Sequence, residues 1–184
     1  MAVLRTDIER ALDELASQHD GMRFQGLAVV LGRKRWPELI ARQRKKDFGL
    51  DAYAAASLTP EKIGKGLDAS ISPTLKKISA DAKTAKENFA DLGMLLFVTS
   101  AKIGNASRRE WEKAIQEEHG LELHLIEREE IITLLMMPEN AGLCARFLYL
   151  DVGATPQIAE LIEKTRRAAA LVTETWTART KGCA

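Results

Sequence analysis

The amino-acid sequence predicts an α/β fold in which helices flank a central mixed β-sheet. Three observations support this class. Residues 94–99 form a continuous apolar run, which is typical of a strand buried on both faces. Strand and helix patterns then alternate over residues 94–137, which predicts neighbouring parallel strands joined by a right-handed crossover. Three shorter strand patterns precede Pro73 and predict a meander within the same sheet.

Two helices are expected before the first strand. Apolar residues recur at helical spacing over residues 4–15, and the segment 19–21 (His-Asp-Gly) ends that helix. A second helix has its apolar positions within residues 24–31 and ends at Gly32. Trp36-Pro37 interrupts the helical pattern, because proline restricts the residue before it to extended backbone.

The meander is expected to contain three strands. Residues 38–43 predict a short edge strand, and residues 50–57 predict a second strand. A hairpin containing Gly64 and Gly66 is expected to lead into a third strand over residues 67–72.

A third helix is expected directly after this strand. Pro73 suits its first turn, Ser72 is a plausible N-cap, and the helical pattern runs to about Asn88. The elements expected after the apolar strand are a helix from Ser107 to His119, a strand over 121–126, a helix over 128–137 that Pro138 stops, and a short, mostly helical segment over 140–150.

The chain is expected to form one domain over residues 1–150 and a C-terminal element over 151–184. A long helix is predicted from Pro156 to about Arg179, and its second half is rich in alanine. Such a helix indicates a connector or a dimerisation element. A connector with nothing after it would suit a chain cut from a longer protein.

Composition limits the classes of protein that fit. The net charge is only +1, so overall charge does not indicate a nucleic-acid partner. Cys144 and Cys183 are the only cysteines and neither lies in a C-x-x-C pair, which argues against a zinc site or a disulfide framework. We interpret Cys144 as a buried apolar residue. A reducing cytoplasm is expected, and no apolar stretch approaches the roughly 20 residues that a membrane span needs.

Three residues near the ends of the predicted strands can support metal-dependent chemistry. Asp51 begins the second strand after Gly49, and Asp68 lies in the third strand. Two such carboxylates suffice for Mg²⁺ (or Mn²⁺), which retains several waters. Lys77, near the start of the next helix beside Lys76, can place a positive charge over the strand ends. Phosphodiester hydrolysis needs a metal cation on the scissile phosphate, an activated water, and a positive charge near the negative charge that develops.

A basic segment offers candidate contacts to nucleic-acid backbone. Its positive residues are interrupted by a single acid, Glu38. Such a run is most often a solvated face, but it also suits a surface that follows phosphates. Its members are Arg33, Lys34, Arg35, Arg42, Arg44, Lys45 and Lys46, of which we predict that Arg42, Arg44, Lys45 and Lys46 contact the backbone. Aromatic residues make up only 5% of the chain, and Trp36 beside this segment is the most plausible base-stacking residue.

The order of these motifs resembles the restriction-endonuclease-like superfamily, whose motif is PD-(D/E)xK. The matching segments are residues 49–52 (Gly-Leu-Asp-Ala), 68–70 (Asp-Ala-Ser), 77–82, 95–99 (Leu-Leu-Phe-Val-Thr) and 120–132. The chain is most similar to the Mrr-related branch, which occurs as effector domains of bacterial anti-phage proteins. The resemblance covers about residues 20–150 and depends on the order and spacing of short motifs.

The resemblance implies roles for individual residues. Asp51 matches the first metal-binding acid and Asp68 the second. Ser70 stands where the motif has its lysine, and Lys77 matches a lysine that this branch carries in the following helix. Gln25 stands where many relatives have a glutamate, and its amide can orient water but binds a metal more weakly than a carboxylate does.

The sequence therefore predicts a metal-dependent DNA endonuclease with Mg²⁺ or Mn²⁺ as cofactor. DNA would be held through its backbone with little sequence reading, and further domains, a regulatory partner or a homo-oligomer would select the substrate. The alternative is a catalytically degenerate domain that serves in nucleic-acid binding or scaffolding, which the departures at Ser70 and Gln25 favour. A flavodoxin-like or receiver-like domain is a weaker third possibility, because its phosphate loop or acid cluster is missing.

Overall fold

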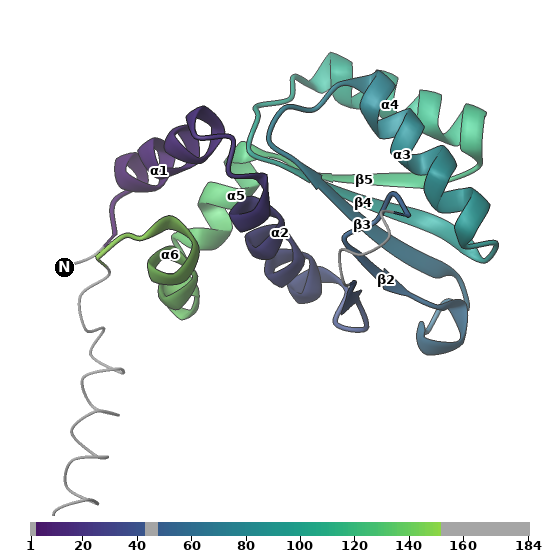
Figure 1. Ribbon diagram of the computed structural model, residues 1–184, viewed down its shortest axis with the longest axis horizontal. Helices are drawn as coiled ribbons and strands as arrows, with labels where there is room; N and C mark the ends of the chain where they lie inside the picture. Colours follow the sequence, from purple (N-terminus) through teal and green to yellow (C-terminus); the bar gives the residue numbers. More distant parts are fainter. Residues whose placement is uncertain (1–2, 43–47, 152–184) are drawn as a thin grey trace, which may run out of the picture.

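A five-stranded mixed sheet forms the centre of the molecule (Figure 1). The computed structural model describes residues 3–42 and 48–151. The strands lie in chain order across the sheet: β1 (Ile40–Ala41), β2 (Ala52–Ala54), β3 (Gly64–Ser70), β4 (Leu92–Thr99) and β5 (Glu122–Ile126).

The direction of the strands changes at β3. The strands β1, β2 and β3 form an antiparallel meander, whereas β3, β4 and β5 run parallel. Ala52 pairs with Leu67, so the start of β2 lies beside the later part of β3. On the other side of β3, Asp68 pairs with Phe97 of β4. The predicted α/β class and mixed sheet are confirmed, and this register determines which side chains meet at one end of the sheet.

Helices cover both faces of the sheet (Figure 1). The helices α3 and α4 lie on one face and pack on each other, while α2 lies against β3 on the other face, with α1, α5 and α6 beyond it. Their bounds are α1 (Arg5–Ser17), α2 (Gly21–Arg35), α3 (Leu75–Asn88), α4 (Asn105–His119), α5 (Arg128–Leu135) and α6 (Ala141–Leu148), with 3₁₀ turns at Ala56–Leu58 and Pro138–Asn140.

The two faces of the sheet belong to two apolar cores. The larger core fills the space between the sheet and the α1, α2, α5 and α6 group, and Phe24 and Leu96 are fully buried in it. The smaller core lies under α3 and α4 and is centred on Phe97 and Ile115. Because successive strand residues point to opposite faces, the adjacent β4 residues Leu96 and Phe97 contribute to different cores.

Several details of the sequence prediction were wrong, among them the end of α2, which lies at Arg35 and not at Gly32. Gly64 and Gly66 lie inside β3 and not in a hairpin turn. A Cβ atom on Gly64 would lie 2.7 Å from the carbonyl oxygen of Asp91, so glycine is needed there for close packing within the sheet. The cap of α3 is Thr74 and not Ser72, because its side chain accepts the Lys77 amide. The second strand is also shorter than predicted, since a 3₁₀ turn begins at Ala56.

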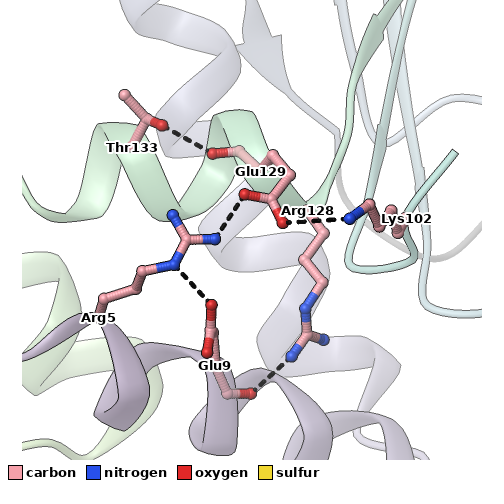
Figure 2. A network of polar contacts seen from close by, with 6 residues as sticks. All are labelled: Arg5, Glu9, Lys102, Arg128, Glu129 and Thr133. Atoms are coloured by element: carbon pink, nitrogen blue, oxygen red, sulfur yellow. Dashed lines mark hydrogen bonds and ion pairs between the residues drawn. The ribbon is translucent and has the colours of Figure 1, made fainter. Parts of the chain in front are cut away.

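A network of charged residues fastens α1 to α5 (Figure 2). The Arg5 guanidinium contacts Glu9 of its own helix at 2.7 Å and Glu129 of α5 at 2.5 Å. Arg128 donates to the Glu9 carbonyl at 3.0 Å, and Lys102 approaches Glu129 at 3.9 Å. These contacts hold the first helix onto the group that covers the larger core.

Part of the sequence prediction falls outside the residues that the structure describes. The long helix expected over residues 156–179 lies outside the described residues, as does Cys183, whereas Cys144 is buried as predicted.

Within the described ranges, no single helix is long and apolar enough to cross a membrane. Arg128–Leu135 and Pro138–Leu148 pass that test only as a pair bent by 95°, and both contribute residues to the larger core. The cytoplasmic location stays a prediction.

Candidate active site

Backbone pairing holds Asp51 beside the end of β3. The Asp51 amide donates to the Leu67 carbonyl at 2.7 Å, and the Asp51 carbonyl accepts the Arg42 amide at 2.9 Å. The side chain turns toward β3, where its Oδ2 accepts the Ala69 amide at 3.0 Å. Asp51 is thus anchored to the residue that directly follows Asp68. Accepting a backbone N–H also suits a purely structural acid, and this bond places the Asp51 carboxylate beside the end of β3.

Gly49 allows the chain to reach this position. Its φ of +76° lies in the left-handed region that favours glycine. A Cβ atom there would lie 2.4 Å from the Asp81 carbonyl oxygen and 3.2 Å from the Ala85 amide nitrogen. The turn before Asp51 therefore packs directly on the backbone of α3, which carries Lys77.

We expect Gly49→Ala to destabilise the fold and displace Asp51. The left-handed conformation alone costs a residue with a Cβ about 1–2 kcal/mol, and the contact with a rigid helix backbone adds to that cost. Thermal unfolding measures the loss of stability. Gly104→Ala is the matched control, because no atom lies within 4 Å of a Cβ at that position. Equal melting temperatures for the two variants would contradict the packing described.

β3 carries two buried charges with different surroundings. The Lys65 ammonium contacts Glu38 at 2.7 Å and Glu61 at 2.8 Å, and these carboxylates keep the pKa of Lys65 raised although burial acts to lower it. Asp68 is only 7% exposed, and its Oδ2 is buried without a hydrogen-bond partner. An ionised carboxylate in such a place is costly. Lys65 has two close carboxylate partners, whereas among the described residues the nearest cation to the Asp68 carboxylate is Lys77, 3.9 Å away.

Burial raises the pKa of Asp68 well above its ordinary value of 3.8. The Lys77 charge opposes this shift, while the negative charges of Asp81 and Asp51 add to it. Asp51, Asp68 and Asp81 bring three negative charges to the site, against the positive charges of Lys77 and of Arg42 at its wall. The local field therefore favours either a proton or an additional cation at Asp68.

Lys77 supplies the positive charge of the site. It occupies the first turn of α3, and its Nζ lies 3.9 Å from Asp68 Oδ2 and forms an ion pair with Asp81. Burial acts to lower the pKa of Lys77, but Asp68, Asp81 and Asp51 together raise it, so the ammonium stays charged. Asp81, one turn after Lys77 in α3, is thus its ion-pair partner. Lys76 is exposed and does not line the site.

One cavity of about 520 Å³ brings the predicted site residues together. It is formed by the junction of α1 and α2, the start of β2, the end of β3 and the start of α3. Asp51, Asp68, Lys77 and Gln25 all line it. The other lining residues are His19, Gly21, Phe24, Arg42, Leu50, Ala69, Ser70, Ile71, Ser72 and Asp81.

The basic segment is only partly a free surface. Arg44, Lys45 and Lys46 lie outside the described residues. Arg42 lines the cavity, and its guanidinium lies 4.6 Å from the Phe89 ring centre. Arg35 instead approaches Glu130 at 3.7 Å. Trp36 is buried with its ring edge against His124, which excludes the stacking role considered for it.

Sequence reasoning missed His19 as a residue of the site. The structure places it in the cavity wall with a φ of +50°, at the junction of α1 and α2. The His-Asp-Gly break located that junction correctly. Its position facing the end of β3 follows from helix packing, which local sequence does not report.

The donor set suits a hard divalent cation. Magnesium takes oxygen ligands and commonly needs only one or two protein carboxylates, with water completing its shell. Asp51 and Asp68 offer such oxygens, and the buried Oδ2 of Asp68 has no hydrogen-bond partner. The described residues contain no group of three or more metal-ligating side chains, so any cation here would be held mainly by these two acids and water.

No protein-family model matches the sequence. No curated protein matches it at a significant level either. The resemblance to the restriction-endonuclease-like superfamily therefore stays a prediction that rests on the motifs and on the site.

Proposed function

We propose that this chain is a metal-dependent nuclease domain with a restriction-endonuclease-like core. The observation that supports this most is the buried carboxylate of Asp68, whose Oδ2 has no hydrogen-bond partner and which shares one cavity with Asp51 and Lys77. A buried charge without a full set of partners costs stability, and such costs are typical of functional sites.

Each residue of the cavity has a role in this proposal. Asp51 and Asp68 hold Mg²⁺ or Mn²⁺, which when bound would supply charge stabilisation at the scissile phosphate. Lys77, whose Nζ is 3.9 Å from Asp68, stabilises negative charge that develops on the phosphate. Lys77 thereby has the role of the motif lysine, whose position is occupied by Ser70 in this chain. Gln25 orients water through its amide, and Arg42 at the cavity wall contacts a neighbouring phosphate.

DNA is the proposed substrate, held through its backbone with little sequence reading. This part rests on the resemblance to effector domains of anti-phage proteins. The same resemblance supports a larger protein or a homo-oligomer that selects the target, since cutting both strands of a duplex calls for two sites.

A degenerate domain that binds nucleic acid or acts as a scaffold is the second candidate. The ion pair between Lys77 and Asp81 favours it, because a lysine already paired is less available to a phosphate. The serine at position 70 favours it as well.

Cleavage of supercoiled plasmid separates these candidates. We expect nicking by the purified chain with Mg²⁺ or Mn²⁺, none with EDTA, and a loss of about 10²-fold or more in Asp51→Ala. Glu87→Ala is the control, because Glu87 is an exposed acid on α3 that does not line the cavity. Absence of cutting at high protein concentration, together with no Mg²⁺ or Mn²⁺ binding at millimolar concentration, would support the degenerate domain.

A further inference from the structure

A second cavity adjoins the site and has no role in the proposal above. Its volume is about 390 Å³, and it shares Gln25, Arg42 and Asp51 with the first cavity. These three residues therefore mark the junction of the two cavities. The other lining residues come from α2, the end of β1 and α6: Met22, Gly26, Val29, Val30, Arg33, Ala41, Arg146 and Phe147. We call this cavity the arginine groove.

The charge of the arginine groove is strongly positive. Three of its lining residues are arginines and only Asp51, at the junction, is acidic. Arg33 and Arg146 are exposed, and among the described residues neither has a carboxylate within 4.0 Å. Arg33 Nε donates to the Leu39 carbonyl at 2.8 Å, which fixes its side chain at the groove. Two guanidinium groups beside the cavity that holds Asp51 can bind successive negative groups of a polyanion.

The floor of the groove is apolar. Its exposed part is formed by Met22, which is 64% exposed, and by the half-buried Val30, whereas Phe147 is buried and its ring centre lies 5.0 Å from the Arg146 guanidinium. Gly26 lets this ring lie against α2, because a Cβ there would be 2.9 Å from Phe147 Cε1. An apolar floor with cationic edges matches a nucleotide whose base or sugar is exposed while its phosphates stay in solvent. A duplex presents mainly phosphates, because its bases are stacked inside.

We propose that the arginine groove binds an unpaired nucleic-acid strand on one side of the scissile phosphate. Arg33 and Arg146 contact successive phosphates, and a base or sugar lies on Met22 and Val30. The inference rests on the proposed nuclease function, since the strand would continue past Arg42 into the cavity that holds Asp51. Arg33 and Arg146 are positioning residues and do not touch the reacting atoms.

Equilibrium binding in EDTA tests the groove without any cleavage. The probe is a fluorescein-labelled oligothymidylate, compared with a duplex of the same length by fluorescence anisotropy. We expect the single strand to bind more tightly, and Arg146→Glu to weaken its binding about tenfold. The double variant Arg33→Ala/Arg146→Ala should reduce the slope of log K against log salt by about 1.4, which is about 0.7 for each lost contact on a single strand.

Arg109→Glu is the matched control, because it makes the same charge change on the exposed surface of α4, across the sheet from the groove (Figure 1). Equal binding by Arg146→Glu and Arg109→Glu would overturn the proposal, as would duplex binding as tight as that of the single strand. Melting temperatures of all variants verify folding.

The two proposals fail in different ways. Weakened binding by Arg146→Glu without plasmid nicking by the wild type would support the groove and reject the nuclease. Plasmid nicking by the wild type, together with unchanged single-strand binding by Arg146→Glu, would support the nuclease and reject the groove.

Discussion

Replacing Asp68 with asparagine is expected to reduce metal-dependent cleavage by about 10²–10³-fold and, at the same time, to raise the melting temperature in EDTA. The two effects share one cause. The Asp68 carboxylate is buried, its Oδ2 has no hydrogen-bond partner, and two further acids lie near it. An amide of the same shape removes the buried charge and removes a metal-binding oxygen. The gain in stability should be about 1–3 kcal/mol, or a few degrees for a chain of this length.

The pH dependence follows from the raised pKa of Asp68. Below the ordinary value of 3.8, the carboxyl is protonated in both the folded and the unfolded chain, so the wild type carries no charge penalty. As the pH rises from that value through the raised folded-state pKa, the unfolded chain releases its proton more readily than the folded chain. The wild type should therefore lose stability relative to Asp68→Asn over that window.

Thermal unfolding at several pH values measures both effects. Adding Mg²⁺ should stabilise the wild type by about 2.7 kcal/mol at a hundred times its Kd, and should have little effect on Asp68→Asn. The Asp13→Asn variant is a control, because Asp13 is an exposed acid of α1 that pairs with Arg128 away from the cavity. If Asp68→Asn were less stable than wild type in EDTA at neutral pH, Asp68 would have a structural role.

Lys77→Ala is expected to lower cleavage by about 10²–10³-fold, the usual effect of removing one group that stabilises charge in a transition state. Its second effect acts through Asp68, whose pKa Lys77 holds down. Without that ammonium the pKa of Asp68 rises further, and residual cleavage should need a higher pH. Initial nicking rates measured across pH give both quantities.

Two variants separate a catalytic role of Lys77 from a structural one. Lys76→Ala removes the neighbouring lysine, which is exposed and outside the cavity, and should leave both the rate and its pH profile unchanged. Asp81→Asn removes the ion-pair partner and should leave Lys77 more available to a phosphate. If Lys76→Ala lost as much activity as Lys77→Ala, the catalytic role proposed for Lys77 would be contradicted.

Local patterns were sufficient for most of the secondary structure. The helical spacing of apolar residues located α1 and α2, the continuous apolar run located β4, and His119-Gly120 marked the end of α4, where Gly120 has a φ of +65°. These features depend on neighbours in the chain, through side-chain periodicity and capping. Where the structure differed, as at Gly64 in β3, close packing within the sheet had overridden a turn signal.

The three charged residues of the candidate site were also identifiable from their residue types and order. Asp51, Asp68 and Lys77 follow strand and helix signals at spacings that place them near one end of a sheet, and one cavity contains all three. The order of these residues in the sequence did not predict how deeply Asp68 is buried. The burial of Asp68, whose Oδ2 has no hydrogen-bond partner, depends on β3 lying between two other strands, while Lys65 in the same strand reaches Glu38 and Glu61.

Tertiary packing alone added His19 and Arg146 to the surroundings of the site, and it brought Arg33 of the basic segment to the same groove as Arg146. Arg146 is far from Asp51 in the sequence, and it reaches the arginine groove because α6 packs against α2. The physical reason is that apolar faces determine how helices pack, and that packing then sets which exposed side chains become neighbours. Local sequence specifies each helix and its apolar face, but the partner of that face is chosen by the whole core.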